Sequence, residues 1–103
     1  MKVKNKNFKG LKIIKQKKYI DQRGFLRVTH NQKKVFFKKF IYEYCTTSKK
    51  SALRGFHFQK KYQQAKYVSV LKGKILDCVV DLRKNSKTFG ESFKIILSEK
   101  NCL

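Results

Sequence analysis

A chain of 103 residues with 41% hydrophobic content is long enough for one compact domain and too short for two, so we expect a single domain over residues 1–103. The net charge of +21 is typical of proteins that bind polyanions, but lysines scattered from Lys2 to Lys100 supply most of it, whereas base-reading proteins depend heavily on arginine forks. This distribution disfavours nucleic acid as a partner, and the lack of any apolar run near about 18 residues disfavours a membrane-spanning helix.

The amino-terminal third predicts one strand and one ambiguous segment. Residues Phe25 to Thr29 form an apolar and β-branched run after the turn-like sequence Asp21 to Gly24, and this pattern predicts a strand. Residues 31–39 allow two interpretations: one or two helical turns capped by Asn31, or an extended run through residues 35–37.

The rest of the chain predicts further strands. Alternation along Phe40 to Thr46 predicts one of them. Residues Tyr67 to Leu71 and Ile75 to Leu82 flank a Lys-Gly-Lys sequence, and they predict a hairpin because Gly73 supplies the positive φ of a tight reversal. Residues Phe93 to Leu97 complete the series after a loop.

Short strands at a spacing of about 8 to 12 residues predict an all-β sandwich or barrel. About six strands are expected, whereas a jelly roll has about eight. The chain ends just after a strand, so we expect the edge of the sheet to need cover from another chain or from further sequence.

Residues that ligate metals are few and unfavourably spaced. Cys45, Cys78 and Cys102 form no C-x-x-C pair, and His30 and His57 form no H-x-H pair. We therefore expect no metal ion and reduced thiols. The first ten residues alternate lysine with polar residues and contain no apolar secretion segment, which predicts a cytoplasmic location.

His57 lies in an apolar run over residues 53–59 and has two interpretations, a satisfied core residue or a general base. Lys66 begins the next predicted strand, and the strand after it carries Asp77 and Asp81, which are four residues apart and therefore share a face. A base, an ammonium group and a carboxylate that converge in one barrel would suit removal of a proton beside a carbonyl.

The alternative for these charged residues is structural. Lys66 would then extend to solvent, and Asp81 would pair with Arg83 or another surface cation. The sequence pattern alone leaves both interpretations open.

Six short blocks between about residue 10 and residue 103 give the strongest signal in the sequence. They are Asp21-x-Arg23-Gly24-Phe25, Leu53-Arg54-Gly55-Phe56-His57-Phe58-Gln59, Gln64-x-Lys66-x-Val68, Asp77-x-Val79-x-Asp81-Leu82-Arg83, Ser86-x-Thr88-Phe89-Gly90 and Leu97-Ser98-x-x-Asn101. In this order they resemble the first part of the longer chain of the dTDP-4-dehydrorhamnose 3,5-epimerases.

The resemblance implies an incomplete cupin-type jelly roll whose carboxy-terminal part is missing, assembled as a homodimer and working without cofactor or metal. It also implies the activity: inversion of C3 and C5 in dTDP-4-keto-6-deoxyglucose, a nucleotide-diphosphate keto sugar, on the route to dTDP-L-rhamnose.

By the same resemblance, His57 stands at the position of the catalytic base, and Lys66 at the lysine that contacts the substrate and stabilises the enolate. Arg54 matches an arginine that contacts the substrate, and Arg23 one that binds the nucleotide portion. Asp81 matches a carboxylate near the site.

Some positions depart from the family pattern. Val28 replaces a glutamate, and Tyr42 and Tyr44 replace a Gln-x-Asn pair that contacts the nucleotide. These changes leave open a related cupin 3-epimerase or 3,4-ketoisomerase acting on another nucleotide keto sugar.

The family's general acid, and the aspartate that orients the base, would lie beyond Leu103. We therefore expect a truncated or split product with little activity alone. Two further alternatives are a basic module that binds single-stranded nucleic acid through its lysines and aromatic rings, and a remnant with no function of its own.

Overall fold

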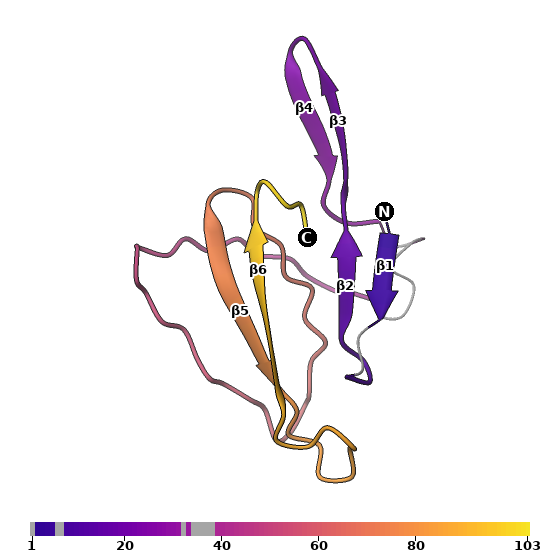
Figure 1. Ribbon diagram of the computed structural model, residues 1–103, viewed down its shortest axis with the longest axis vertical. Helices are drawn as coiled ribbons and strands as arrows, with labels where there is room; N and C mark the ends of the chain where they lie inside the picture. Colours follow the sequence, from indigo (N-terminus) through magenta and orange to yellow (C-terminus); the bar gives the residue numbers. More distant parts are fainter. Residues whose placement is uncertain (1, 6–7, 32, 34–38) are drawn as a thin grey trace.

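The computed structural model describes residues 2–5, 8–31, 33 and 39–103 (Figure 1). Within these ranges it contains six strands and no helix, so the all-β prediction is confirmed. The strands form three antiparallel two-stranded sheets. No helix in the described part of the chain has the length and apolar character needed to cross a membrane.

The three sheets each join strands that are consecutive in the sequence. The strands are β1 (Lys2–Asn5) with β2 (Lys12–Lys15), β3 (Lys17–Asp21) with β4 (Gly24–Val28), and β5 (Lys74–Val80) with β6 (Ser92–Ser98). The count matches the expected six, but β1, β2 and β3 were not among the strands that the sequence predicted.

The β3–β4 hairpin forms around the predicted turn. The Asp21 carboxylate accepts a hydrogen bond from the backbone N–H of Arg23 at 2.8 Å, which closes the turn locally. Gly24 ends it with φ 134°, a conformation that favours glycine. The predicted strand over residues 25–29 is confirmed as β4, and the hairpin stands away from the other strands in Figure 1.

The core is small, and its buried residues come from β2, β6, the carboxy-terminal turn and the segment before β5. Its buried apolar side chains are Ile14, Val70, Leu97 and Cys102.

Hydrogen bonds join Gln16, which follows β2, to the carboxy-terminal turn and to the residue after β4, and they join β4 to the segment before β5. Gln16 donates its backbone N–H to the Cys102 carbonyl at 2.8 Å and its side-chain amide to the Thr29 carbonyl at 3.1 Å. The Arg27 guanidinium donates to the Val70 carbonyl at 2.7 Å. The core is therefore built from residues that are far apart in the sequence.

The predicted hairpin between Tyr67–Leu71 and Ile75–Leu82 is wrong. Residues 67–71 are not a strand, and β5 pairs with β6 along its whole length, with Lys74 opposite Ser98 and Val80 opposite Ser92. The Gly73 carbonyl accepts a hydrogen bond from Glu99 N–H at 3.1 Å, so Gly73 continues this pairing. The strand that pairs with β5 is the predicted strand 93–97, observed as β6.

The predicted strand Phe40–Thr46 is also wrong. Residues 39–73 contain neither strand nor helix, and within this segment Ile41, Tyr42 and Tyr44 are all exposed. A strand requires a ladder of hydrogen bonds to a neighbour, and this segment has none among the described residues. The ambiguous segment 31–39 falls mostly outside the described residues, which omit 32 and 34–38.

Candidate functional site

The segment between the described aromatic residues Phe40 and Tyr67 contains three of the four predicted site residues. Its two ends are close together: the rings of Phe40 and Tyr67 lie 5.8 Å apart, and His30 contacts them at 5.7 and 5.6 Å respectively. The Tyr67 hydroxyl also donates to the Thr29 carbonyl at 2.7 Å. Residues 41–66 therefore form a loop anchored at both ends, which we call the anchored loop.

His57 and Lys66 both lie on the anchored loop, and both are exposed. Neither side chain makes a hydrogen bond, ion pair or ring contact with a residue that the structure describes. Lys66 directly precedes the anchor residue Tyr67, whereas His57 lies far from either end. The structure does not bring the imidazole and the ammonium into direct contact, so their shared role stays a prediction.

Arg54, a third predicted site residue on the anchored loop, has a side chain that is held in place by hydrogen bonds. Its guanidinium donates to the Ser48 hydroxyl and to the Thr47 carbonyl, both at 2.9 Å. A turn closed by a 3.2 Å hydrogen bond from Ala52 N–H to the Lys49 carbonyl lies between these residues. Arg54 is thus oriented by its own loop while it remains exposed.

Arg23 lies apart from the other three, at the tip of the β3–β4 hairpin (Figure 1). Its guanidinium forms an ion pair with Asp21 at 2.7 Å, and their side chains are 91% and 52% exposed. Hydrogen bonds from the side chain and the backbone N–H of Arg23 lower the pKa of the Asp21 carboxyl. No contact between described residues joins Arg23 to the anchored loop.

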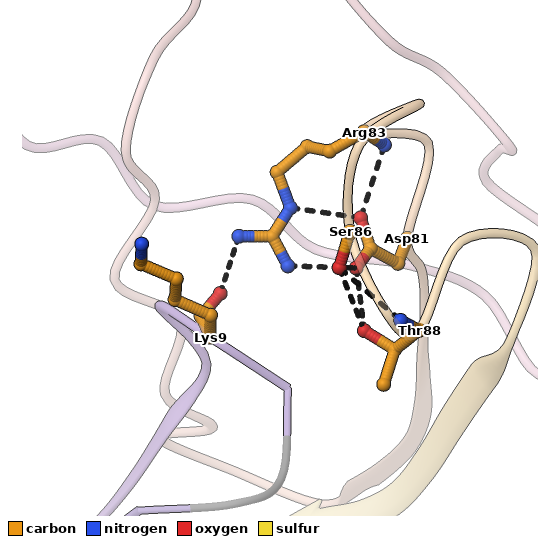
Figure 2. Close-up of polar contacts among 5 residues, drawn as sticks. All are labelled: Lys9, Asp81, Arg83, Ser86 and Thr88. Atoms are coloured by element: carbon orange, nitrogen blue, oxygen red, sulfur yellow. Dashed lines mark hydrogen bonds and ion pairs between the residues drawn. The ribbon is translucent and has the colours of Figure 1, made fainter.

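A second polar group, which the sequence prediction treated as secondary, is densely hydrogen-bonded. The buried Asp81 carboxylate accepts hydrogen bonds from the guanidinium of Arg83 at 2.8 and 2.7 Å, and from the hydroxyls of Ser86 and Thr88 at 2.6 Å each (Figure 2). We call these four residues the Asp81 cluster. The loop between β5 and β6 therefore encloses one carboxylate.

The Asp81 cluster keeps its carboxylate ionised. Hydrogen bonds from the Arg83 guanidinium hold the pKa of Asp81 far below its usual range. Hydrogen bonds from the hydroxyls of Ser86 and Thr88 lower this pKa further. A carboxylate held this firmly is a poor proton acceptor. The structure confirms the alternative in which Asp81 pairs with Arg83, so Asp81 is not a free member of a catalytic group.

Arg83 also joins two distant parts of the chain. Its other terminal nitrogen donates to the Lys9 carbonyl at 2.6 Å, which ties the turn after β1 to the end of β5 (Figure 2). A hollow of about 330 Å³ lies beside this contact, lined by residues 8–11 and 79–83. The lining includes none of the four predicted site residues.

Sequence reasoning missed the anchoring role of His30 and its aromatic neighbours. His30 is 10 residues from Phe40 and 37 from Tyr67, so no local pattern could have paired them. Tyr42 and Tyr44 also form a stacked pair, with ring centres 5.9 Å apart and an interplanar angle of 24°. The i, i+2 spacing of these two tyrosines was the available signal, because side chains two residues apart in extended backbone point the same way.

Among the residues that the structure describes, no group of three or more histidine, cysteine or acidic side chains is placed to bind a metal ion. The three cysteines are free thiols.

Comparison with known proteins gives a consistent result. The sequence model of a family described as dTDP-4-dehydrorhamnose 3,5-epimerase matches residues 5–103. Proteins of that name from Methanothermobacter thermautotrophicus and Shigella flexneri are 40% and 38% identical to the chain over 96 residues, covering 89% and 86% of it. The chain spans about half of their length, 52% in both cases.

Solved structures agree with the sequence comparison. The dTDP-4-dehydrorhamnose 3,5-epimerase from Elizabethkingia anophelis superimposes with a TM-score of 0.86 at 37% identity, over 98% of this chain and 58% of its own. The corresponding structure from Bacillus anthracis, with TDP and PPi bound, gives 0.82 at 33% identity, over 98% and 61%. The likeness confirms the predicted cupin-type fold, of which this chain forms a part.

Proposed function

Because the chain belongs to the dTDP-4-dehydrorhamnose 3,5-epimerase family, we propose that it supplies the proton-abstracting part of a nucleotide-sugar epimerase. The family match over residues 5–103 is the observation that carries the proposal. The substrate is dTDP-4-keto-6-deoxyglucose, and the reaction inverts C3 and C5 in the formation of dTDP-L-rhamnose.

The chemistry follows from the ketone at C4. Its carbonyl acidifies the protons on both neighbouring carbons, so one base can remove each proton in turn and leave an enolate. Epimerisation is complete when a proton returns to the opposite face of the same carbon. No cofactor or metal is needed, because the electron pair is held on the substrate's own oxygen.

In this proposal His57 is the base and Lys66 stabilises the enolate oxygen. A neutral imidazole accepts the proton. The ammonium group lies beside the oxygen, and its attraction for that oxygen strengthens as negative charge develops in the enolate. The exposure of both side chains on the anchored loop supports the assignment, since neither is committed to another described residue.

Arg54 and Arg23 contact the substrate, with Arg23 at its nucleotide diphosphate. Guanidinium groups suit phosphate because their planar fork donates two parallel hydrogen bonds. The TDP bound in the structure of the Bacillus anthracis relative supports a nucleotide diphosphate as the ligand class. The held position of Arg54 against Ser48 and Thr47 supports its role, since an ordered donor loses less entropy on binding.

We further propose that the working assembly is a cytoplasmic homodimer. The β3–β4 hairpin supports a dimer contact, because Ile20, Phe25 and Leu26 are 76%, 61% and 61% exposed on a hairpin that stands apart from the other strands. The free thiols support a reducing compartment.

A second candidate retains the site and changes the substrate. The exposed, stacked Tyr42 and Tyr44 rings favour recognition of a base by stacking rather than by paired amide hydrogen bonds. A 3-epimerase or 3,4-ketoisomerase acting on another nucleotide keto sugar would fit this feature.

The test is deuterium uptake by dTDP-4-keto-6-deoxyglucose in heavy water, followed by NMR. For residues 1–103 alone, which span about half the length of the relatives, we expect uptake at both C3 and C5, slower than with a full-length relative by about 10² to 10⁴. Uptake at C3 alone would favour the second candidate. No uptake above solvent background would reject proton abstraction by this chain, and uptake at the full rate would reject the need for a further acid.

A further inference from the structure

The hydroxyl of Tyr67 belongs to a closed set of three polar groups. It donates a hydrogen bond to the Thr29 carbonyl at 2.7 Å. The side-chain amide of Gln16 donates to the same carbonyl at 3.1 Å and to the Tyr67 hydroxyl oxygen at 3.5 Å. A tyrosine hydroxyl both donates and accepts, so each of the three groups contacts the other two. We call Gln16, Thr29 and Tyr67 the polar triangle.

Gln16 ties the polar triangle to the scaffold. It lies between β2 and β3, is 3% exposed, and donates its backbone N–H to the Cys102 carbonyl at 2.8 Å. Its side-chain oxygen is buried with no hydrogen-bond partner among the described residues. An unpaired buried acceptor is unfavourable, and an apolar side chain of similar size would avoid it. The amide nitrogen, with its two hydrogen bonds, is therefore what glutamine supplies at this position.

The ring and the hydroxyl of Tyr67 make different contacts. The ring lies 5.6 Å from His30 and 5.8 Å from Phe40, which joins the two ends of the anchored loop to each other. The hydroxyl joins the end of the loop to Gln16, and through Gln16 to the carboxy-terminal turn. Tyr67→Phe therefore removes the second link and keeps the first.

Lys66 is the residue next to this link. Its side chain is exposed, and no hydrogen bond between described residues holds any residue from 60 to 66. Consecutive Cα atoms are about 3.8 Å apart, so a residue held in place at 67 fixes the point from which the Lys66 side chain extends. The polar triangle is thus the nearest restraint on Lys66 in the described part of the chain.

The position of that point matters for the proposed reaction. The ammonium of Lys66 lies at the end of a flexible four-carbon stem, and its attraction for the enolate oxygen depends on the distance between the two charges. A charge that is already in place when the enolate forms needs no reorganisation. A misplacement of about 1 Å can lower a rate by about 10².

We propose that Tyr67 is a positioning residue for Lys66: through the polar triangle, its hydroxyl fixes the backbone from which the ammonium reaches the enolate oxygen. Tyr67 does not touch the substrate in this mechanism. The inference rests on the proposed function, since it requires the enolate-stabilising role of Lys66.

The experiment compares Tyr67→Phe with the wild-type 103-residue chain by deuterium uptake in heavy water, at several concentrations of dTDP-4-keto-6-deoxyglucose. The limiting rate should fall about tenfold or more, while the concentration that gives half of it changes less than about twofold, because the loss occurs in the transition state. Tyr19→Phe is the matched control. Tyr19 is 49% exposed and its hydroxyl bonds to no described residue, so the rate should stay within about twofold of wild type.

The Lys66→Ala background separates positioning from a general structural role. If Tyr67 acts through Lys66, adding Tyr67→Phe to Lys66→Ala should lower the rate by less than about twofold. The same fold loss in both backgrounds would overturn the proposal, because a general disturbance of the loop does not need Lys66.

Gln16→Leu tests whether the polar triangle acts as one unit. It should reproduce the loss seen with Tyr67→Phe, and the double variant should be no slower than the slower of the two single variants. Losses that add would also overturn the proposal. Circular dichroism verifies the fold of each variant, and Tyr67→Phe alone decides the question where Gln16→Leu does not fold.

A measurement without substrate keeps this proposal separate from the proposed reaction. Backbone amide relaxation measured by NMR should give order parameters near about 0.85 at Lys66 and Tyr67 in the wild-type chain, and near about 0.6 in Tyr67→Phe. Unchanged order parameters at Lys66 would overturn the proposal whatever the rates show. If they fall but the wild-type chain takes up no deuterium, the proposed reaction is rejected and the hold of Tyr67 on Lys66 is confirmed.

Discussion

The Asp81 cluster and the anchored loop use arginine in contrasting ways. In the cluster, Arg83 donates to a buried carboxylate and to the distant Lys9 carbonyl, so it joins separate parts of the fold. On the loop, Arg54 donates only to nearby Ser48 and Thr47 among the described residues, and it stays exposed. Arg83, which bonds to a distant part of the chain, belongs to the scaffold, whereas the exposed Arg54 remains available to a ligand.

The same contrast exists between two Asp-Arg pairs of identical spacing. Asp21 with Arg23, and Asp81 with Arg83, both form ion pairs at 2.7 Å. The Asp21 side chain is 52% exposed and the Asp81 side chain 1% exposed. Distance alone therefore does not determine what a pair contributes, because exposed pairs are screened by solvent.

The largest expected effect is that of Asp81→Ala. The substitution removes the carboxylate that accepts hydrogen bonds from Arg83, Ser86 and Thr88, so thermal unfolding followed by circular dichroism should shift to a clearly lower temperature. Asp21→Ala is the matched control and should change the midpoint little. Equal shifts for the two variants would contradict the contrast between the pairs.

Acid should reproduce part of this effect. The folded pKa of Asp81 is depressed, so its contribution to stability is fully present above the unfolded pKa of about 3.9 and is lost as the pH falls below that value toward the folded pKa. Denaturant unfolding measured between about pH 6 and pH 2 should show a steeper loss for the wild-type chain than for Asp81→Asn. Parallel pH profiles would show that Asp81 is not the group responsible.

The smallest effect should come from the anchored loop. Leu53 is 89% exposed, so Leu53→Ser removes little buried surface, and the free energy of unfolding should change by less than about 0.5 kcal/mol. A loss above about 2 kcal/mol in denaturant titration would mean that Leu53 is buried in solution, and that the loop is part of the scaffold.

Local patterns predicted three of the six strands in the described residues but not their partners. Residues 25–29, 75–82 and 93–97 were predicted as strands and are observed as β4, β5 and β6 with shifted ends, because apolar and β-branched runs report local preference. The tight turn at Gly73 suggested the wrong partner for β5. The true connection is longer, and it is held by hydrogen bonds to Asp81 that no spacing rule predicts.

The site was predictable only as a set of residue types. The blocks around Arg54, His57 and Lys66 were recognisable in the sequence, whereas the anchoring of their loop depends on His30, Phe40 and Tyr67, which are distant in sequence. The sequence also could not show that Asp81 is enclosed. Whether Asp81 is free or bonded depends on how the loop after β5 folds back onto it, and the periodicity of a strand does not contain that information.

The most direct test of the central claim is deuterium uptake at C3 and C5 of dTDP-4-keto-6-deoxyglucose by His57→Ala, measured beside the wild-type chain and His30→Ala. If the exposed imidazole of the anchored loop is the base, His57→Ala reduces uptake at both carbons to the solvent background, added imidazole restores part of it, and His30→Ala retains it wherever the loop stays folded. Undiminished uptake by His57→Ala would contradict the account.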